Sequence, residues 1–349
     1  MIKSDQGAKD MPTMRELSRW IRDYGHNPRH LSRLMSNRFI WHQLWTATDI
    51  IDDVESAMTA YVENEFPSDL GEKYLRVYGA MQGLFIQQDA LRDLIKAIHP
   101  ARAIVLTDVL KDIRDARHAS VGHPTKLNRK GALSAHGIVQ NSIRKDGFDL
   151  LSYPEKDGKM FQHVPVLELI EKQRAEAVRI LSEVVEDLRE QERAHREQFR
   201  EIKLRAVFDG VSYAFEKIFE EVRPGSTFIM GSWGVGHLQK SLDDFETLLK
   251  DRGLSIDMYD SIEYFYDEIK HPLTELTKYI KREPSEISSR KSAVVFTDAL
   301  QGHFDSLRDI AGELDEDYAS APDPVVQSVH PEVQMTFTTT VIGKKGSSG

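Results

Sequence analysis

YLRVYGAMQGLFIQQDALRDLIKAI, residues 74–98, is the stretch that decides the fold of this chain. Its apolar side chains recur at alternating intervals of three and four residues for about seven turns of a helix. The stripe consists of Tyr74, Val77, Met81, Leu84, Leu91, Ile95 and Ile98, interrupted by the polar Gln88. The pattern predicts a long helix that buries one face and ends before Pro100.

The segments on either side continue the helical pattern. Residues 41–61 carry apolar side chains at the same spacing, and Pro67 and Gly71 separate them from the central helix. A third helix is predicted over 101–121, ended by Gly122 and Pro124. Three amphipathic helices with short connections predict a helical domain with one shared core.

Beyond residue 133 the hydrophobic period changes. Three short, partly alternating runs are separated by Asp-Gly turn formers and predict a three-stranded antiparallel meander over 134–143, 148–153 and 159–166. A long helical stretch is then predicted from 167 to about 222. Its charged half fits a solvated face better than a coiled coil that binds a partner. Three more helices follow at about 237–251, 257–282 and 285–315, with Ser285 as the cap of the last and Pro272 as a kink in the one before.

The predicted fold is therefore mainly α, with a small antiparallel β-meander and a C-terminal helical domain. The chain is divided into an N-terminal extension, a helical domain, the meander, a C-terminal helical domain with a long charged helix, and a tail or edge strand, at 1–40, 41–132, 133–166, 167–320 and 321–349.

Composition excludes several classes of protein. With 349 residues, 40% apolar and 29% charged, the chain can bury a sizeable core, which excludes a disordered protein. Its net charge of -10 argues against binding nucleic acid over the whole surface. The absence of cysteine removes disulfides, thiolate zinc sites and a cysteine nucleophile. No apolar run reaches the ~20 residues that span a bilayer, so we expect a cytoplasmic protein that does not enter the membrane.

One arginine and one histidine stand out near the end of the third predicted helix. Arg117 continues the apolar stripe of Leu106, Leu110 and Ile113, so its side chain is expected on the inner face. Burying an unpaired charge costs several kcal/mol, so such an arginine implies an internal carboxylate, a subunit interface or an anionic ligand. His123 follows six residues later, and the break at Gly122 can turn it back toward Arg117.

The same region is a basic island on an acidic protein. Residues 101–145 hold nine Lys and Arg against three Asp, a net charge of +6 in a chain of -10. Such an island favours a site for a polyanion. The alternative is a helix C-terminus whose basic residues suit the helix dipole, with His123 as a capping residue.

The helices predicted over 41–61, 74–98 and 101–121, with YGAMQGLFIQQDALRDL in the second and RHASVGHP at the end of the third, together resemble the HEPN superfamily. The signature of that family is an arginine, four to six residues, and a histidine, with a polar Asn, Asp or His directly after the arginine. Arg117, five intervening residues and His123 match it, and His118 fills the polar position. The resemblance covers residues 40–125.

The resemblance implies a metal-independent endoribonuclease site shared across a homodimer, as in toxins and antiphage-defence effectors. Arg117 and His123 would be the catalytic pair, and Arg114, His118 and Lys126 would bind the phosphates of the RNA. No cofactor or metal is expected, and a neutralising or sensor protein is a further possible partner. The competing interpretation is a catalytically inactive dimerisation or interaction protein of the same family.

Other motifs give weaker evidence of function. GSWGVGH at 231–237 lacks the order of a phosphate-binding loop and predicts the start of a helix. Asp49, Asp52, Asp53 and Glu55 fit a solvated face better than a metal site. Gln88 is either a satisfied core amide or a partner of the Arg117 cleft.

Overall fold

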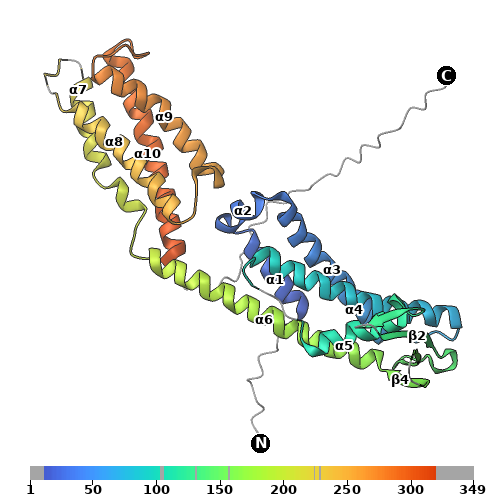
Figure 1. The fold of residues 1–349 in the computed structure, drawn as a ribbon. Coiled ribbons are helices and arrows are strands. Elements are labelled where there is room, and N and C mark those ends of the chain that lie inside the picture. Colours follow the sequence, from blue (N-terminus) through green and yellow to red (C-terminus); the bar gives the residue numbers. More distant parts are fainter. Residues whose placement is uncertain are drawn as a thin grey trace, which may run out of the picture.

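A computed structural model describes residues 12–102, 106–129, 132–155, 158–223, 225–227 and 229–319. Within these ranges the chain is mainly helical with one small antiparallel sheet, which confirms the predicted fold class. Two helical bodies are joined by the long helix α6 (Val166–Phe199), which runs along the first body and reaches the base of the second (Figure 1).

The N-terminal body has one continuous core to which α6 contributes up to Leu188. Besides α6 its helices are α1 (Met14–Gly25), α2 (Pro28–Met35), α3 (Arg38–Glu63), α4 (Leu70–Ile98) and α5 (Asp108–Arg117). The predicted helices at 41–61 and 74–98 are confirmed, and both begin a few residues earlier because Asn37 and Asp69 cap them. The described part of the N-terminal extension is helical and buries Leu17, Ile21 and Leu34 in the same core.

The third predicted helix begins later than expected. Helix α5 starts at Asp108 instead of 101, because the side chain of Thr107 accepts a hydrogen bond from the backbone N–H of Leu110 and caps the helix there. After Arg117 the chain continues as one π-helical turn, His118–Gly122.

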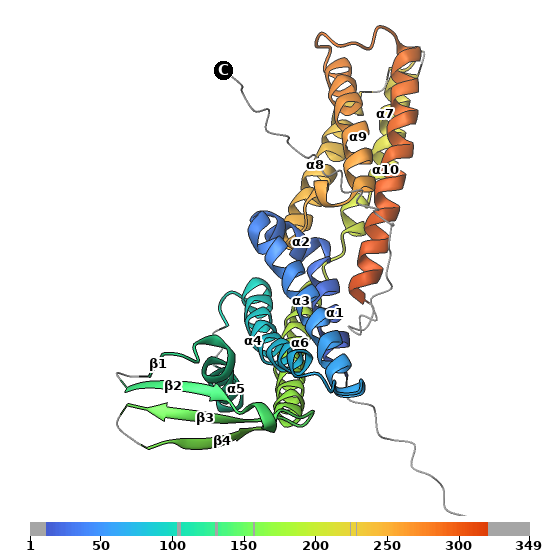
Figure 2. The same cartoon turned by 90° about the vertical axis from the view of Figure 1, so that its right-hand side faces the viewer.

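The sheet has four strands where the sequence predicts three. Its antiparallel order is β1-β2-β3-β4, formed by Leu127–Arg129, Ala132–Ile138, Phe148–Pro154 and Met160–Val164. The additional strand β1 pairs Leu127 with Ser134 and is too short to show an alternating pattern. Figure 2 shows the sheet at the end of the N-terminal body that lies away from the second body.

The long helical stretch predicted over 167–222 is broken. Helix α6 ends at Phe199, and a 3-10 turn, Arg205–Phe208, leads to α7 (Val211–Val222). Gly210 between them has φ 83°, a left-handed conformation that no helix interior accommodates. The apolar spacing continues across this break, which is why periodicity alone does not reveal it.

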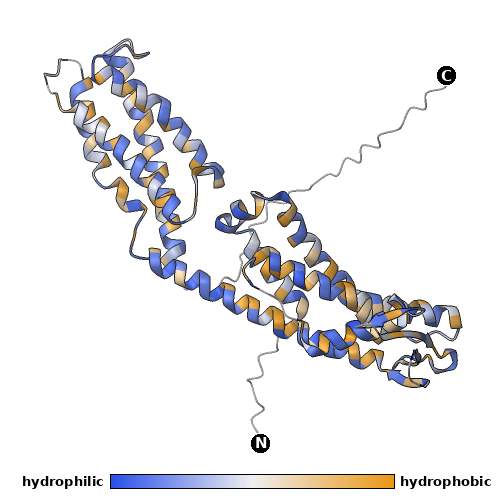
Figure 3. Cartoon of the chain, viewed as in Figure 1, coloured by the Kyte–Doolittle hydropathy of each residue, from blue (hydrophilic) through white to orange (hydrophobic). Residues whose placement is uncertain are grey.

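The C-terminal body is a four-helix bundle with its own apolar core, which begins at Leu204. Its helices after α7 are α8 (Gly231–Asp251), α9 (Asp260–Ile280) and α10 (Arg290–Ala319). Figure 3 shows hydrophobic and hydrophilic residues alternating along the helices of both bodies, as expected of amphipathic helices. Pro272 lies inside α9 as predicted, but Ser285 does not cap α10. Ser289 does, since its hydroxyl accepts a hydrogen bond from the backbone N–H of Ser292.

The predicted tail or edge strand at 321–349 lies outside the described residues. Within the ranges given above, no helix is both long and apolar enough to cross a lipid bilayer.

Candidate functional site

The predicted site residues lie where α5 and the π-helical turn pack against α4. Gln82, Phe85 and Asp89 are spaced at three and four residues on α4 and share the face that meets α5. Arg114 and Arg117, three residues apart on α5, face them. A polar stripe therefore faces a basic stripe, with the aromatic ring of Phe85 between them.

Arg117 is half-buried, and its partner is a neutral amide. Its Nε and Nη2 donate to the Gln82 side-chain oxygen at 3.0 and 2.6 Å, and its guanidinium lies 4.3 Å from the centre of the Phe85 ring. Of the acidic residues in the described ranges, none pairs with it. The inward-facing guanidinium of Arg117 therefore contacts an amide and the face of an aromatic ring, neither of which neutralises its charge.

Arg114, by contrast, has a carboxylate. Its Nη1 donates to Asp89 at 2.9 Å, and its guanidinium lies 4.0 Å from the centre of the same Phe85 ring. The side-chain oxygen of Gln88 is 3.5 Å from that nitrogen, and the Gln88 amide donates to Gln173 of α6 at 2.7 Å. Gln88 is therefore both a satisfied core amide and a support for the arginine pair.

The π-helical turn determines where the histidines lie. The backbone N–H of His123 donates to the carbonyl of His118 at 2.8 Å, the five-residue bond that widens the turn. The two imidazole rings are nearly parallel, with centres 6.2 Å apart, and the ring of His118 also meets the edge of Phe85 at 5.7 Å. His123 is exposed, whereas His118 is half-buried.

Gly122, at the end of this turn, lets the Arg117 side chain approach the backbone closely. A Cβ atom there would lie 2.4 Å from Nη1 of Arg117, so the guanidinium folds over a position that has no side chain. That nitrogen has no acceptor among the described residues. The turn therefore leaves one edge of the Arg117 guanidinium without a protein partner.

The electrostatics favour a neutral imidazole beside two cations. Burial lowers the pKa of His118, and the charges of Arg117 and Arg114 lower it further. A neutral imidazole can accept a proton at neutral pH, and a guanidinium can stabilise negative charge that develops on a phosphate. The cluster can thus combine proton transfer with anion binding.

The structure does not bring Lys126 into this cluster. Its side chain is exposed, beyond the π-helical turn, and makes no ion pair with the described residues. Sequence reasoning also missed Gln82 and Phe85. The signal that could have found them is their shared spacing with Asp89 on one face of α4.

The other motifs have structural roles. Glu55 pairs with Arg174 at 2.9 Å and Asp49 with Arg22 at 2.5 Å. Nowhere in the described part of the chain do three or more histidine, aspartate or glutamate side chains gather as metal ligands would. The glycine-rich motif starts α8, as predicted, and a Cβ atom at Gly234 would lie 2.8 Å from the carbonyl oxygen of Ala214 on α7.

Comparisons of this chain with family models, with curated proteins and with solved structures find no match. The class of the site therefore follows from its residues alone.

Proposed function

We propose that this chain is a metal-independent endoribonuclease of the HEPN type, with Arg117 and His123 as the catalytic pair. The observation that carries the proposal is the state of Arg117, a half-buried guanidinium with a neutral partner and one unpartnered edge. An anion is the ligand that such a group prefers, and a planar guanidinium binds a phosphate through two parallel hydrogen bonds.

The two imidazoles supply the proton transfers that cleavage of RNA requires. The ribose 2′-oxygen attacks the phosphorus while one imidazole accepts its proton, and the bond to the 5′-oxygen breaks as a second group donates a proton to that oxygen. The products are a 2′,3′-cyclic phosphate and a 5′-hydroxyl. Neutral His118 suits the accepting role and exposed His123 the donating role, and the 6.2 Å between their ring centres is within reach of one phosphodiester group.

A homodimer is part of the proposal. Leu75, Tyr78 and Ile86 of α4 are exposed by 73, 40 and 36% and follow one face of the helix on which Gln82 also lies. An apolar stripe beside a catalytic arginine fits a second copy of this chain, which would bring two Arg117 side chains to one RNA phosphate. A mass near twice 39.9 kDa in light scattering is the expected result, with a monomer after Leu75→Glu.

The test is cleavage of a mixed RNA pool in the presence of EDTA. The wild-type protein should produce fragments with cyclic phosphate ends and leave DNA intact, because DNA lacks the 2′-hydroxyl. His123→Ala and Arg117→Ala should each lower the rate roughly 10²-fold or more. The matched control is His271→Ala, a surface histidine that pairs only with exposed Glu286 among the described residues. Equal rates in all four proteins, or loss of cleavage on chelation, would contradict the proposal.

The same apolar stripe favours one alternative, a dimerisation or interaction protein of the HEPN type without catalysis. Growth on overexpression separates the two. Arrest by the wild-type protein that disappears in His123→Ala indicates an active effector of a toxin or antiphage-defence system, whereas arrest that persists indicates binding alone.

A further inference from the structure

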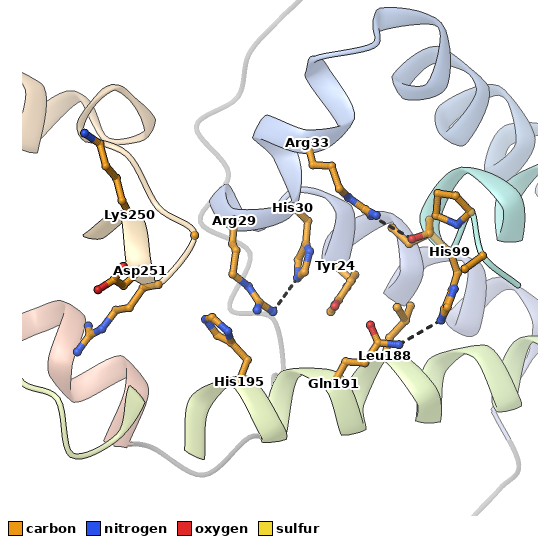
Figure 4. Close-up of a pocket in the computed structure, with 15 residues that line it drawn as sticks. Tyr24, Arg29, His30, Arg33, His99, Leu188, Gln191, His195, Lys250 and Asp251 are labelled. Carbon is orange, nitrogen blue, oxygen red and sulfur yellow. Dashed lines mark hydrogen bonds between the residues drawn. The ribbon is translucent and has the colours of Figure 1, made fainter. Parts of the chain in front are cut away.

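A cleft of about 650 Å³ lies where the two bodies meet, far along α6 from the Arg117 cluster. Its walls come from α1 and α2, from the residues that follow α4, and from the C-terminal end of α8, while α6 forms its floor. Figure 4 shows Arg29 and His30 reaching from α2 toward this floor, and His195 rising from it toward Arg29. The volume falls in the usual range of pockets for small molecules, roughly 300–1,000 Å³.

The lining is basic. It contains Arg29, Arg33, Lys250 and Arg252 against a single carboxylate, that of Asp251. A cleft with such a lining concentrates anions.

Two of these cations are used by the C-terminal bundle itself. Arg252 is completely buried and pairs with Asp315 at 2.7 Å, and Lys250 pairs with Glu246 at 2.6 Å. The side chain of Lys250 points away from α2 (Figure 4). These two residues add positive potential to the wall but are poor candidates for direct contact with a ligand.

Arg29 and Arg33 differ from them in being accessible from the cleft, and both keep donors that the protein does not use. Two donors of Arg252, Nε and Nη1, also have no partner among the described residues, but they are buried. Arg29 and Arg33 are four residues apart on α2 and therefore share a face. Arg29 contacts Glu192 and His30 through Nη2 alone, and Arg33 donates from Nη2 to the carbonyl of Ile98 at 3.0 Å. For the Nε and Nη1 atoms of both side chains, no acceptor exists among the residues that the structure describes.

A stack of aromatic side chains lies beside the two arginines. The rings of Tyr24 and His30 are stacked with centres 4.2 Å apart, and the rings of Trp20 and Tyr24 are stacked with centres 5.4 Å apart. Burial raises the pKa of Tyr24 to about 12 and lowers that of His30, so both rings are neutral at pH 7. Tyr24 is only 9% exposed and already stacks on two rings, whereas His30 stacks on Tyr24 alone among the described residues. A neutral ring at the end of such a stack can stack on a heterocyclic base and form a hydrogen bond with its edge.

We propose that this cleft binds a nucleotide, with its phosphate at Arg29 and Arg33 and its base against His30. The arginines alone would suit any small anion, and the adjoining aromatic rings are what favour a base linked to the phosphate. Because the lining includes Arg29 of α2 and Gly253 at the end of α8, the bound nucleotide would lie between the two bodies.

Isothermal titration calorimetry on the full-length chain tests this proposal, with AMP, adenosine and inorganic phosphate as separate probes. We expect AMP to bind at least tenfold more tightly than either fragment. Arg33→Ala should weaken AMP binding about tenfold or more, the value of a charge-assisted hydrogen bond. This variant should fold, since Arg33 is exposed and pairs with no carboxylate in the described ranges. Arg19→Ala is the matched control, an exposed arginine of α1 outside the cleft.

Each outcome decides the proposal. Selective loss in Arg33→Ala, with Arg19→Ala unchanged, supports it. No binding of AMP, equal loss in both variants, or phosphate binding as tightly as AMP overturns it. The Arg117 cluster is a second place where a phosphate could bind, so the titration is repeated on Arg117→Ala. Unchanged affinity there supports the cleft and leaves the ribonuclease proposal untouched, whereas loss there with full binding in Arg33→Ala overturns the cleft.

Discussion

Arg117 in the N-terminal body and Arg252 in the C-terminal body are both inward-facing arginines that meet an aromatic ring, and they differ in their partners. Arg252 is completely buried, pairs with the Asp315 carboxylate at 2.7 Å and lies 4.4 Å from the Tyr318 ring. Arg117 is half-buried and has only the amide of Gln82 and the ring of Phe85.

The difference teaches how to separate a structural arginine from one available to a ligand. A carboxylate that pairs with a completely buried guanidinium neutralises it and commits it to the fold, because breaking such a pair leaves an uncompensated charge. An amide accepts hydrogen bonds from two donors and holds the side chain in place, but it leaves the positive charge available to bind an anionic ligand. Burial and aromatic contact alone do not distinguish the two cases.

The largest effect is expected from Asp315→Ala. Its carboxylate pairs with Arg252 and also accepts the backbone N–H groups of Leu204 and Arg205, each at 3.0 Å. Removing it leaves a buried cation and two unsatisfied donors, so the free energy of unfolding should fall by about 3–5 kcal/mol in urea denaturation. Asp309→Ala, an exposed aspartate on the same helix, should change it by less than about 0.5 kcal/mol. Similar small changes in both variants would remove the contrast with Arg117.

The next largest effect is expected in acid, where stability should depend on a carboxylate paired with arginine but not on Arg117. Burial of Glu192 would raise its pKa, but the hydrogen bond with His30 and the charges of Arg29 and Arg196 outweigh this and lower the pKa to about 2 from 4.5. Between these values the unfolded state binds the proton and the folded state does not, so stability is lost as pH falls from 4.5 to 2, by about 3 kcal/mol. Burial lowers the pKa of His195 to about 4 from 6.5. Between these values the unfolded state again binds the proton and the folded state does not, so stability is also lost as pH falls from 6.5 to 4.

Chemical denaturation at a series of pH values measures this dependence. Glu192→Gln should flatten the slope below pH 4.5, and His195→Gln should flatten it between pH 6.5 and 4. No carboxylate pairs with Arg117 in the described part of the chain, so Arg117→Ala should leave the slope below pH 4.5 unchanged. A change in Arg117→Ala below pH 4.5, where carboxylates titrate, would show that a carboxylate neutralises the arginine after all.

Apolar spacing in the sequence predicted the long helices. It failed to predict breaks and strands that depend on one backbone conformation or one pairing. Helix α4 keeps its spacing for about seven turns with Gln88 as the one polar member of the stripe, and its predicted end at Ile98 is confirmed. The break before α7 depends on Gly210, whose left-handed conformation is invisible to periodicity. Strand β1 exists only through its pairing with β2.

The candidate site was predicted in part for the same reason. The inner position of Arg117 follows from its own helix, because neighbours three and four residues away define a face. Its partner Gln82 lies 35 residues earlier on α4. The spacing of α4 places Gln82 on one face with Asp89, but no local pattern indicates that this face meets α5. The cleft is still harder to predict, because its walls combine residues as far apart in the sequence as Tyr24 and Gly253.

A smaller effect should follow from Gln82→Glu, which gives Arg117 the kind of partner that Arg252 has. The new carboxylate would take the place of an oxygen 2.6 Å from Nη2 and neutralise the guanidinium. We expect RNA binding to weaken about tenfold in filter-binding assays while stability rises by up to about 1 kcal/mol. Gln198→Glu, an exposed position on α6, carries the same change in net charge and should weaken RNA binding little. Equal weakening in both variants would show that Arg117 acts only through the overall charge of the protein.

The smallest effect is expected from Gly122→Ala, which moves Arg117 without removing any of its contacting groups. A Cβ atom at this position lies 2.4 Å from Nη1 of Arg117 and 3.4 Å from the ring of His118, so the flexible end of the arginine has to shift. Gly122 does not have a left-handed backbone, and alanine favours helical turns, so the free energy of unfolding should change by less than about 1 kcal/mol. RNA cleavage should fall about fivefold, the equivalent of roughly 1 kcal/mol in the barrier, because the displaced nitrogen is the one that protein acceptors leave open. Gly236→Ala on α8, where a Cβ atom meets nothing within 4 Å, should leave both quantities unchanged. Full activity in Gly122→Ala would mean that the open edge of Arg117 does not contact the substrate, and the parallel with a structural arginine such as Arg252 would then be closer than their partners suggest.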